Sequence, residues 1–216
     1  MGTVHSDWAP MLAILAVASL VVGNLAAIIQ TNIKRMLAYS TVSHMGFILL
    51  AFMAGAVGFT AGLYYAITYA LMAAVSFGVL MVLSTKDIEC ENIKDLAGLN
   101  HRHAWFAFLM LLSMFSMAGI PPLMGFYAKF GVIMALLKQG HVWLSVFAVI
   151  MSLIGAFYYL RVVKVIYFDA PDHDQPVGSN YAAKFVLTVN AFLLLLWGIM
   201  PQTVIDWCAK ALENTL

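Results

Sequence analysis

Two titratable side chains interrupt long apolar stretches of the sequence: Lys129 in SMAGIPPLMGFYAKF and His44 in LAYSTVSHMGF. A charge at the centre of a bilayer costs about 2.5–3.5 kcal/mol on insertion scales, so ionisable residues there usually serve a function. Burial disfavours the ammonium form of lysine, so a buried Lys129 can take up and release a proton. We therefore predict that Lys129 carries protons. The alternative is that it extends to the outer surface, for which Lys138 is better placed.

His44 shares a helix face with Ser40 and Ser43, because the three residues follow the spacing i, i+3, i+4. Histidine titrates near neutral pH, which suits a residue that passes protons on. Serine and histidine also hydrogen-bond across packed membrane helices, so a purely structural role stays open. We predict a relay role for His44, with Ser40, Ser43 and Tyr127 as candidate members of the same relay.

The residues just before Lys129 predict a break in a membrane helix. Pro122 cannot donate a backbone hydrogen bond, and the rings of Pro121 and Pro122 crowd the preceding turn. Gly119 and Gly125 are expected to loosen the backbone on either side. Carbonyls near Ala118 then lose their helical partners, which is costly in hydrocarbon unless protein or water replaces them. The break should therefore face a hydrated, protein-lined cavity, as discontinuous helices in transporters do.

Other familiar patterns of chemistry are missing from the sequence. The apolar stretches contain no carboxylate, and Cys90 and Cys208 are too far apart to suggest a metal site or a disulfide. Neither a glycine-rich phosphate loop nor a CxxC cluster occurs, so we predict no catalytic residue, no metal and no cofactor within this chain. Tyr158 and Tyr159 are interpreted as packing aromatics.

Composition identifies the elements that must position these side chains. Hydrophobic residues make up 63% of the 216 residues and charged residues 10%, whereas a soluble domain carries about 25% charged residues. This composition indicates an integral membrane protein. The net charge of +1, without a basic tail, gives no indication of nucleic-acid binding.

Apolar runs of about 20 residues predict an all-α, multi-pass bundle of about six membrane helices in one domain, residues 1–216. The predicted spans are 8–29, 36–56, 61–83, 104–137, 142–168 and 182–200. As one unbroken helix, the fourth would be about 51 Å long, against a hydrocarbon core of about 30 Å. We predict that Pro121 and Pro122 divide it. In the tail, the spacing of Val204, Cys208 and Leu212 suggests a short interfacial helix.

Basic residues predict the orientation, because cytoplasmic loops are enriched in Lys and Arg. Six spans place both termini on the same side of the membrane. One set of connections holds Lys138 and Lys210, and the other holds Lys34, Arg35, Lys86, Lys94, Arg102, Arg161, Lys164 and Lys184. The larger set should face the cytoplasm, so both termini should face the periplasm of a bacterial inner membrane.

Four motifs in this order, QTNIKRMLAYSTVSHMGF, ENIKDLAGL, SMAGIPPLMGFYAKF and GAFYYLRVVKVIYF, closely resemble the antiporter-like membrane subunits of respiratory complex I. The best match is to the subunit N group of the bacterial NADH-quinone oxidoreductase. The resemblance covers residues 9–203. It implies that the chain corresponds to the second five-helix repeat plus the last helix. It further implies that Lys129 is the conducting lysine of the second interrupted helix and that His44 lies on the central hydrated axis.

The resemblance also implies a function and partners. Such a chain would be part of a translocase enzyme that couples electron transfer from NADH to quinone, in other subunits, to proton transport. NAD, FMN, iron–sulfur clusters and quinone would bind in those partners. Neighbouring antiporter-like subunits and small membrane subunits would surround the chain. The family's first repeat has no counterpart here, so this chain should carry only the outward half-channel.

Two other functions fit the sequence. One is a subunit of a related cation/proton antiporter or membrane-bound hydrogenase, which share these motifs. The other is a structural membrane segment that conducts no protons, as the lack of an intramembrane carboxylate would favour.

Overall fold

The computed structural model describes residues 2–84, 90–171 and 181–213, and within these ranges it is all-α, as predicted. The described part contains eight α-helices, one short 3-10 helix and no β-strand. The helices are α1 (Gly2–Ile29), α2 (Ile33–Met53), α3 (Gly55–Leu83), η1 (Ile93–Leu96), α4 (Leu99–Ala118), α5 (Met124–Lys138), α6 (Val142–Phe168), α7 (Tyr181–Ile199) and α8 (Pro201–Glu213).

Five of the described helices, α1, α2, α3, α6 and α7, are long and apolar enough to cross a membrane. Large apolar side chains cover their outer faces, for example Ile14, Leu153 and Phe185, each 70% exposed. Exposed apolar area on this scale suits a lipid environment rather than water. α4 and α5 together correspond to the predicted fourth span, which is divided as expected.

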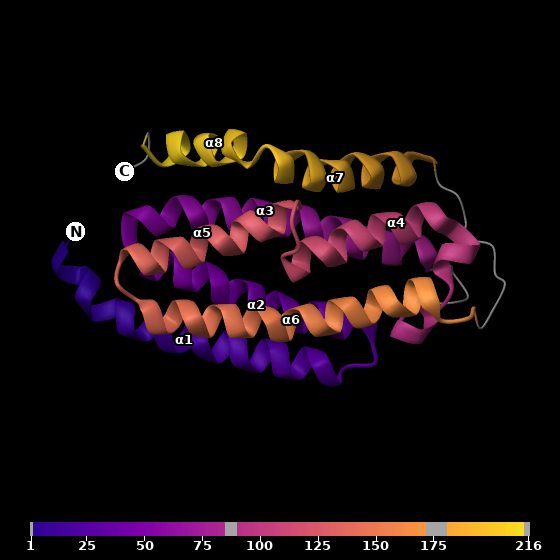
Figure 1. Ribbon diagram of the computed structural model, residues 1–216, viewed down its shortest axis with the longest axis horizontal. Coiled ribbons are helices and arrows are strands. Elements are labelled where there is room, and N and C mark those ends of the chain that lie inside the picture. The colour runs from indigo at the N-terminus through magenta and orange to yellow at the C-terminus, as the bar shows by residue number, and fades with distance from the viewer. Residues whose placement is uncertain (1, 85–89, 172–180, 214–216) are drawn as a thin grey trace.

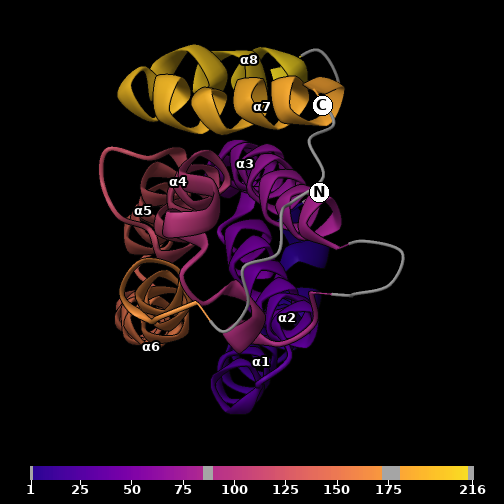
Figure 2. The same cartoon turned by 90° about the vertical axis from the view of Figure 1, so that its right-hand side faces the viewer.

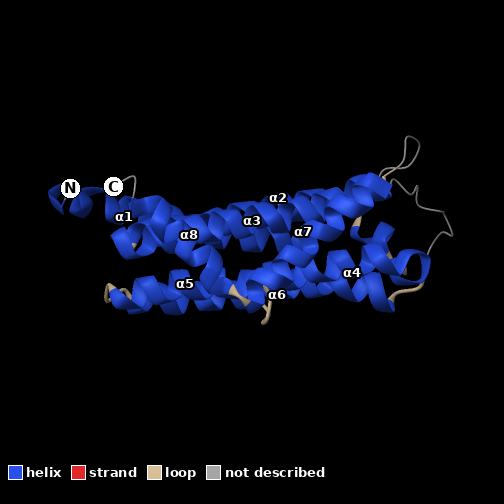
Figure 3. Ribbon diagram, turned by 90° about the horizontal axis from the view of Figure 1, so that it is seen from above, coloured by secondary structure: helices blue, strands red, loops and turns tan. Residues whose placement is uncertain are grey.

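The helices lie nearly parallel and form layers (Figure 1 and Figure 2). α1 packs mainly against α2, and α4 packs mainly against α6. α7 and α8 form an outer layer that covers α3, α4 and α5. The connection between α4 and α5 lies midway along the bundle (Figure 3), as does the short junction of α7 with α8 (Figure 1). The interrupted helix therefore places its break midway along the bundle axis.

α2 and α3 are joined more tightly than the predicted spans imply. α2 ends at Met53 and α3 begins at Gly55, with Ala54 between them. Gly55 has φ 66°, in the left-handed region that glycine adopts at little cost. Because one glycine allows this reversal, no polar turn separates the two helices, and the sequence pattern could not locate the boundary.

α8 confirms that the tail is helical but differs from the predicted interfacial helix. It follows α7 in the same outer layer, and Val204 and Cys208 are buried against the bundle, where α8 packs on α3. Pro201 occupies the first position of α8, where its missing N–H costs no helical hydrogen bond. The apolar spacing in the tail therefore reflects packing on α3. α1 begins and α8 ends at the same end of the bundle (Figure 1).

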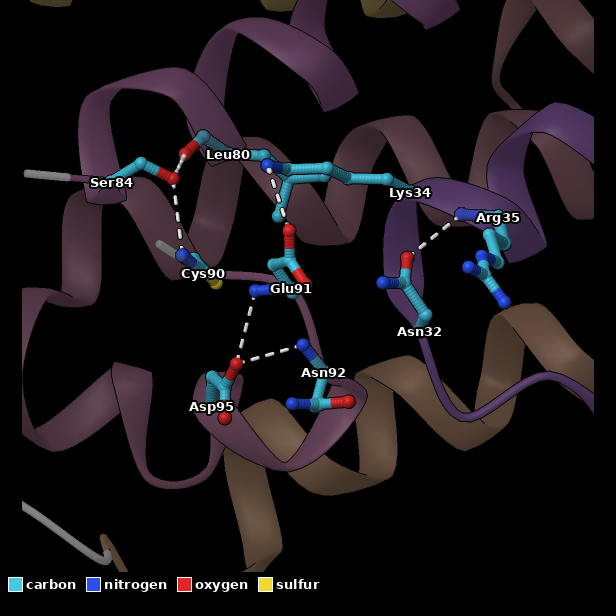
Figure 4. Close-up of polar contacts among 9 residues, drawn as sticks. All are labelled: Asn32, Lys34, Arg35, Leu80, Ser84, Cys90, Glu91, Asn92 and Asp95. Atoms are coloured by element: carbon cyan, nitrogen blue, oxygen red, sulfur yellow. Dashed lines mark hydrogen bonds and ion pairs between the residues drawn. The ribbon is translucent and has the colours of Figure 1, made fainter. Parts of the chain in front are cut away.

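At the opposite end, two of the sequence motifs meet (Figure 4). Segments around Asn32 and Asn92 pair antiparallel, with Ile33 N–H donating to Glu91 O at 2.7 Å and Ile93 N–H donating to Thr31 O at 2.9 Å. The Asp95 carboxylate accepts from two backbone N–H groups at the start of η1, and Asn32 caps α2. This pairing fixes the loop after α3 to the start of α2.

Candidate functional site

α4 ends at the break through a glycine-based cap. Gly119 has φ 87° and ψ 40°, a left-handed conformation that favours glycine. The N–H of Gly119 donates to Ser116 O at 3.0 Å, and the N–H of Ile120 donates to Phe115 O at 3.0 Å. These two bonds satisfy carbonyls of the last turn and leave that of Ala118 pointing past the helix end without a helical partner.

Pro121 and Pro122 lie in the break, joined by a cis peptide bond, and both are exposed. Gly125 lies in the first turn of α5 rather than in the break itself. A Cβ atom at Gly125 would overlap the carbonyl oxygen of Ser116, so glycine is needed here for close approach of the two half-helices. Gly125 therefore borders the break and allows the two half-helices to approach closely, and its expected loosening of the backbone stays a prediction.

Lys129 lies in the second turn of α5, and its side chain reaches back to the break. The side chain is only 7% exposed, and its amine donates to Ala118 O and to Ser152 Oγ, each at 3.0 Å. The amine also lies 5.6 Å from the centre of the Phe47 ring, within cation–π range. The carbonyl that the break leaves without a helical partner is thus bound by the lysine amine.

The two half-helices cap each other. Ser116 Oγ of α4 accepts from the Gly125 N–H at the start of α5, at 3.1 Å, while Lys129 of α5 donates to the last carbonyl of α4. Both bonds are buried. The side chain that we expect to change its charge is therefore also part of the structure of the break.

No carboxylate in the described part of the chain forms an ion pair with the Lys129 amine; the ion pairs found there join Lys34 to Glu91 and Lys164 to Asp169. An unpaired ammonium is costly in a buried, apolar environment. Within the described residues, the Lys129 amine is therefore held by hydrogen-bond acceptors and an aromatic ring rather than by a carboxylate.

His44 is buried between two tyrosines. Its Nδ1 lies 2.8 Å from the Tyr65 hydroxyl on α3, and its Nε2 lies 3.0 Å from the Tyr159 hydroxyl on α6. The ring also packs on Tyr69, with centroids 4.7 Å apart. A neutral imidazole donates from one nitrogen and accepts at the other, so a change of tautomer reverses both bonds. This arrangement can pass a proton between two hydroxyl groups.

Lys129 and His44 are neighbours in the fold without a direct hydrogen bond in the described residues. Phe47, beside the lysine amine, stacks on Tyr65 with centroids 5.6 Å apart and an interplanar angle of 14°. Tyr65 in turn bonds to His44. Two aromatic rings therefore lie between the two titratable groups.

The remaining predicted relay residues have different surroundings. Ser40 Oγ donates to Leu37 O of its own helix, and Ser43 Oγ accepts from the Asn24 amide of α1, which is the interhelical role that the sequence left open. The Tyr127 ring packs edge-on against Phe126, and within the described contacts its hydroxyl bonds to neither Lys129 nor His44.

Sequence reasoning missed the contribution of α6. Ser152 and Tyr159 lie two helical turns apart on one face, and they bind Lys129 and His44 respectively. The interpretation of Tyr159 as a packing aromatic is incomplete, because its hydroxyl bonds to His44. The spacing i, i+7 of two hydroxyl groups was the signal that could have identified this face.

The described residues contain no group of three or more His, Cys, Asp or Glu side chains that could hold a metal ion.

Residues 1–155 match the model of the family described as NADH:quinone oxidoreductase/Mrp antiporter, TM. The chain belongs to this family. The antiporter-like membrane fold expected from the motifs is thereby confirmed. The five long apolar helices agree with the assignment to a membrane protein.

Among curated relatives in the family, NADH-quinone oxidoreductase subunit N of Neisseria gonorrhoeae (strain ATCC 700825 / FA 1090) is 81% identical across the whole chain. Subunit N of Nitrosomonas europaea is 50% identical over the same extent. The chain covers 45% of each of these proteins, so it spans less than half the length of these relatives.

Solved structures share this fold. A chain of respiratory complex I from Thermus thermophilus with bound aureothin superposes with a TM-score of 0.82 at 31% identity, covering 91% of this chain and 45% of that one. A chain of the Mrp complex from Dietzia sp. DQ12-45-1b superposes with a TM-score of 0.86 at 22% identity, covering 97% and 47%. The second likeness concerns the fold alone.

Proposed function

We propose that this chain forms the outward half-channel of a proton-translocating membrane subunit of NADH-quinone oxidoreductase, with Lys129 as the proton carrier and His44 as its relay. The observation that carries the proposal is the buried Lys129 amine, which bonds to the carbonyl exposed by the helix break. The identity to subunit N proteins supports the assignment to this complex.

The two states of the Lys129 amine suit this role. As an ammonium it has three donors and no acceptor, so it can hold Ala118 O and Ser152 Oγ and offer one proton more. As a neutral amine it keeps the bond to Ala118 O, while its lone pair accepts from the Ser152 hydroxyl. A change in charge therefore reverses one hydrogen bond without opening the break.

The driving force for proton transfer through Lys129 would be electrostatic. Electron transfer from NADH to quinone in partner subunits would shift a charge near Lys129 and change its proton affinity, because charges interact strongly in a poorly solvated interior. Water at the break beside Pro121 would then deliver or remove the proton. NAD, FMN, iron–sulfur clusters and quinone would all bind in those partners, and neighbouring antiporter-like and small membrane subunits would flank this chain.

We further propose a single membrane domain in the bacterial inner membrane with both termini in the periplasm. The distribution of Lys and Arg supports this orientation, with Lys86 lying outside the described residues. Single cysteines placed at Lys138 and at Lys94 would test it. A membrane-impermeant thiol reagent should label the first in intact spheroplasts and the second only in inverted vesicles. The reverse pattern would overturn the orientation.

The alternatives of a cation/proton antiporter, a membrane-bound hydrogenase or a non-conducting segment predict different phenotypes. Inverted vesicles from a strain lacking this chain should lose NADH-driven quinone reduction and proton uptake together, and the wild-type gene should restore both. An antiporter subunit would leave NADH oxidation intact and abolish sodium/proton exchange. Lys129→Arg should assemble better than Lys129→Ala, because arginine keeps a donor for Ala118 O.

A further inference from the structure

Asn24 places a buried amide near the C-terminal end of α1, with 1% of its surface exposed. Its Nδ2 donates to Leu20 O at 2.8 Å and to Ser43 Oγ of α2 at 2.9 Å. Its Oδ1 accepts from the Tyr158 hydroxyl of α6 at 3.1 Å. One side chain of α1 thus joins α2 to α6, and both hydrogens of its amide group are used.

The two partners of Asn24 are the chain neighbours of the His44–Tyr159 pair. Ser43 precedes His44, and Tyr158 precedes Tyr159. α2 and α6 are therefore connected directly through the 3.0 Å contact of His44 Nε2 with Tyr159 and also indirectly through Asn24. The rings of Tyr158 and Tyr159 lie 4.4 Å apart, so the position of one constrains the other.

The packing of α6 on α1 leaves little freedom around this bridge. A Cβ atom at Gly155 would lie 3.1 Å from Asn24 Oδ1, closer than ordinary van der Waals contact. Further along α6, the Arg161 guanidinium donates to Ile28 O at 3.0 Å and to Gln30 O at 2.7 Å, at the end of α1. α6 is thus attached to α1 on both sides of Tyr159.

We propose that Asn24 is a positioning residue that sets the distance between His44 and Tyr159. Proton transfer needs heavy atoms about 2.6–3.2 Å apart, and the present contact of 3.0 Å lies near the upper limit. An apolar side chain at position 24 frees Ser43 and Tyr158 from each other, so α2 and α6 lose the connection through Asn24. The inference rests on the proposed function, because only proton transfer through His44 makes this distance matter.

The test uses the assembled complex in inverted membrane vesicles. Asn24→Leu removes the amide at similar volume, Tyr158→Phe removes a single hydroxyl, and Asn24→Asp in its neutral form keeps one donor and one acceptor. Ser76→Ala is the matched control, because its hydroxyl is buried and bonds to Ser113 at 2.6 Å between α3 and α4, away from His44. Each variant is measured for assembled complex, NADH oxidation and protons translocated per NADH.

We expect Asn24→Leu and Tyr158→Phe to show at least half of the fall in protons per NADH that Lys129→Ala causes, at near wild-type NADH oxidation. Asn24→Asp should recover most of the ratio, and Ser76→Ala should keep it. Adding Asn24→Leu to His44→Gln should cause no further fall, since both act on one contact.

A wild-type ratio in Asn24→Leu, or a fully additive double variant, would show that Asn24 only packs helices. If the Asn24→Leu complex does not assemble, the number of protons translocated per NADH in Tyr158→Phe alone decides whether Asn24 positions His44 and Tyr159. A wild-type ratio in Lys129→Ala would instead overturn the proposed function, so the two failures are distinguishable.

Discussion

Gly198 on α7 provides a sharp test of the helix break, because it packs directly on the backbone of that break. A Cβ atom at this position would overlap Pro122 O and would lie 2.7 Å from Met124 N and 2.8 Å from the carbonyl carbon of Leu123. Ordinary contacts of carbon with other heavy atoms are about 3.5–4.0 Å. All of the atoms in conflict belong to the backbone, so a rotation of a side chain cannot relieve the overlap.

We predict that Gly198→Ala lowers the free energy of unfolding through overpacking, which typically costs about 1–3 kcal/mol. Gly131→Ala is the matched control, since it also lies within an α-helix and its added Cβ would meet only Ala61 Cβ, at 3.7 Å. Both substitutions gain about 1 kcal/mol of helix propensity. The difference between the two variants therefore isolates the clash with the break.

The assay is SDS-induced unfolding of the purified chain in mixed micelles, followed by circular dichroism and tryptophan fluorescence. Gly198→Ala should unfold at a lower SDS fraction than wild type, and Gly131→Ala at an equal or higher fraction. Equal stability of the two variants would refute the close packing of α7 on the segment around Pro122. The covering of the break by α7 would then be wrong as well.

Two further predictions concern the bonds of Arg161 to the end of α1 and the burial of Cys90. Arg161→Ala should lower the free energy of unfolding by about 1–3 kcal/mol, because the charge-assisted hydrogen bonds to the carbonyls of Ile28 and Gln30 are lost. The control Lys164→Ala removes an exposed ion pair and should cost less than about 1 kcal/mol. Equal effects of the two variants in SDS unfolding would contradict this ranking. Burial raises the pKa of the Cys90 thiol from 9.0 to about 11, so iodoacetamide should modify it about 100-fold more slowly at pH 8 than an exposed thiol, and faster as the pH rises toward 11. Mass spectrometry of a variant with the other cysteine replaced by serine measures this rate. A reaction as fast as that of glutathione would contradict the burial of Cys90.

The fold and the break were predictable because their signals are local. Apolar runs define the long helices, and two adjacent prolines after a glycine end a helix wherever they occur. The presence of Lys129 beside that break follows from the same short segment. The role of Gly125 could not be read in this way, since the overlap with Ser116 arises only when two half-helices pack together.

The partners of the titratable side chains could not be predicted, because they come from distant parts of the chain. His44 and Tyr159 are separated by 115 residues, and Asn24 and Tyr158 by 134. A hydroxyl on a helix indicates neither the neighbouring helix nor the depth at which it pairs. The sequence could show that such groups are costly to leave unpaired in lipid, but only the packing shows which groups satisfy them.

The central claim is that the Lys129 amine carries the protons that cross this part of the membrane. The most direct measurement is the number of protons translocated per NADH oxidised in inverted vesicles, for Lys129→Ala and for Lys138→Ala, which removes an exposed lysine of the same helix. We predict a lower ratio in the first variant and a wild-type ratio in the second. A wild-type ratio in both, at normal levels of assembled complex, would contradict the account.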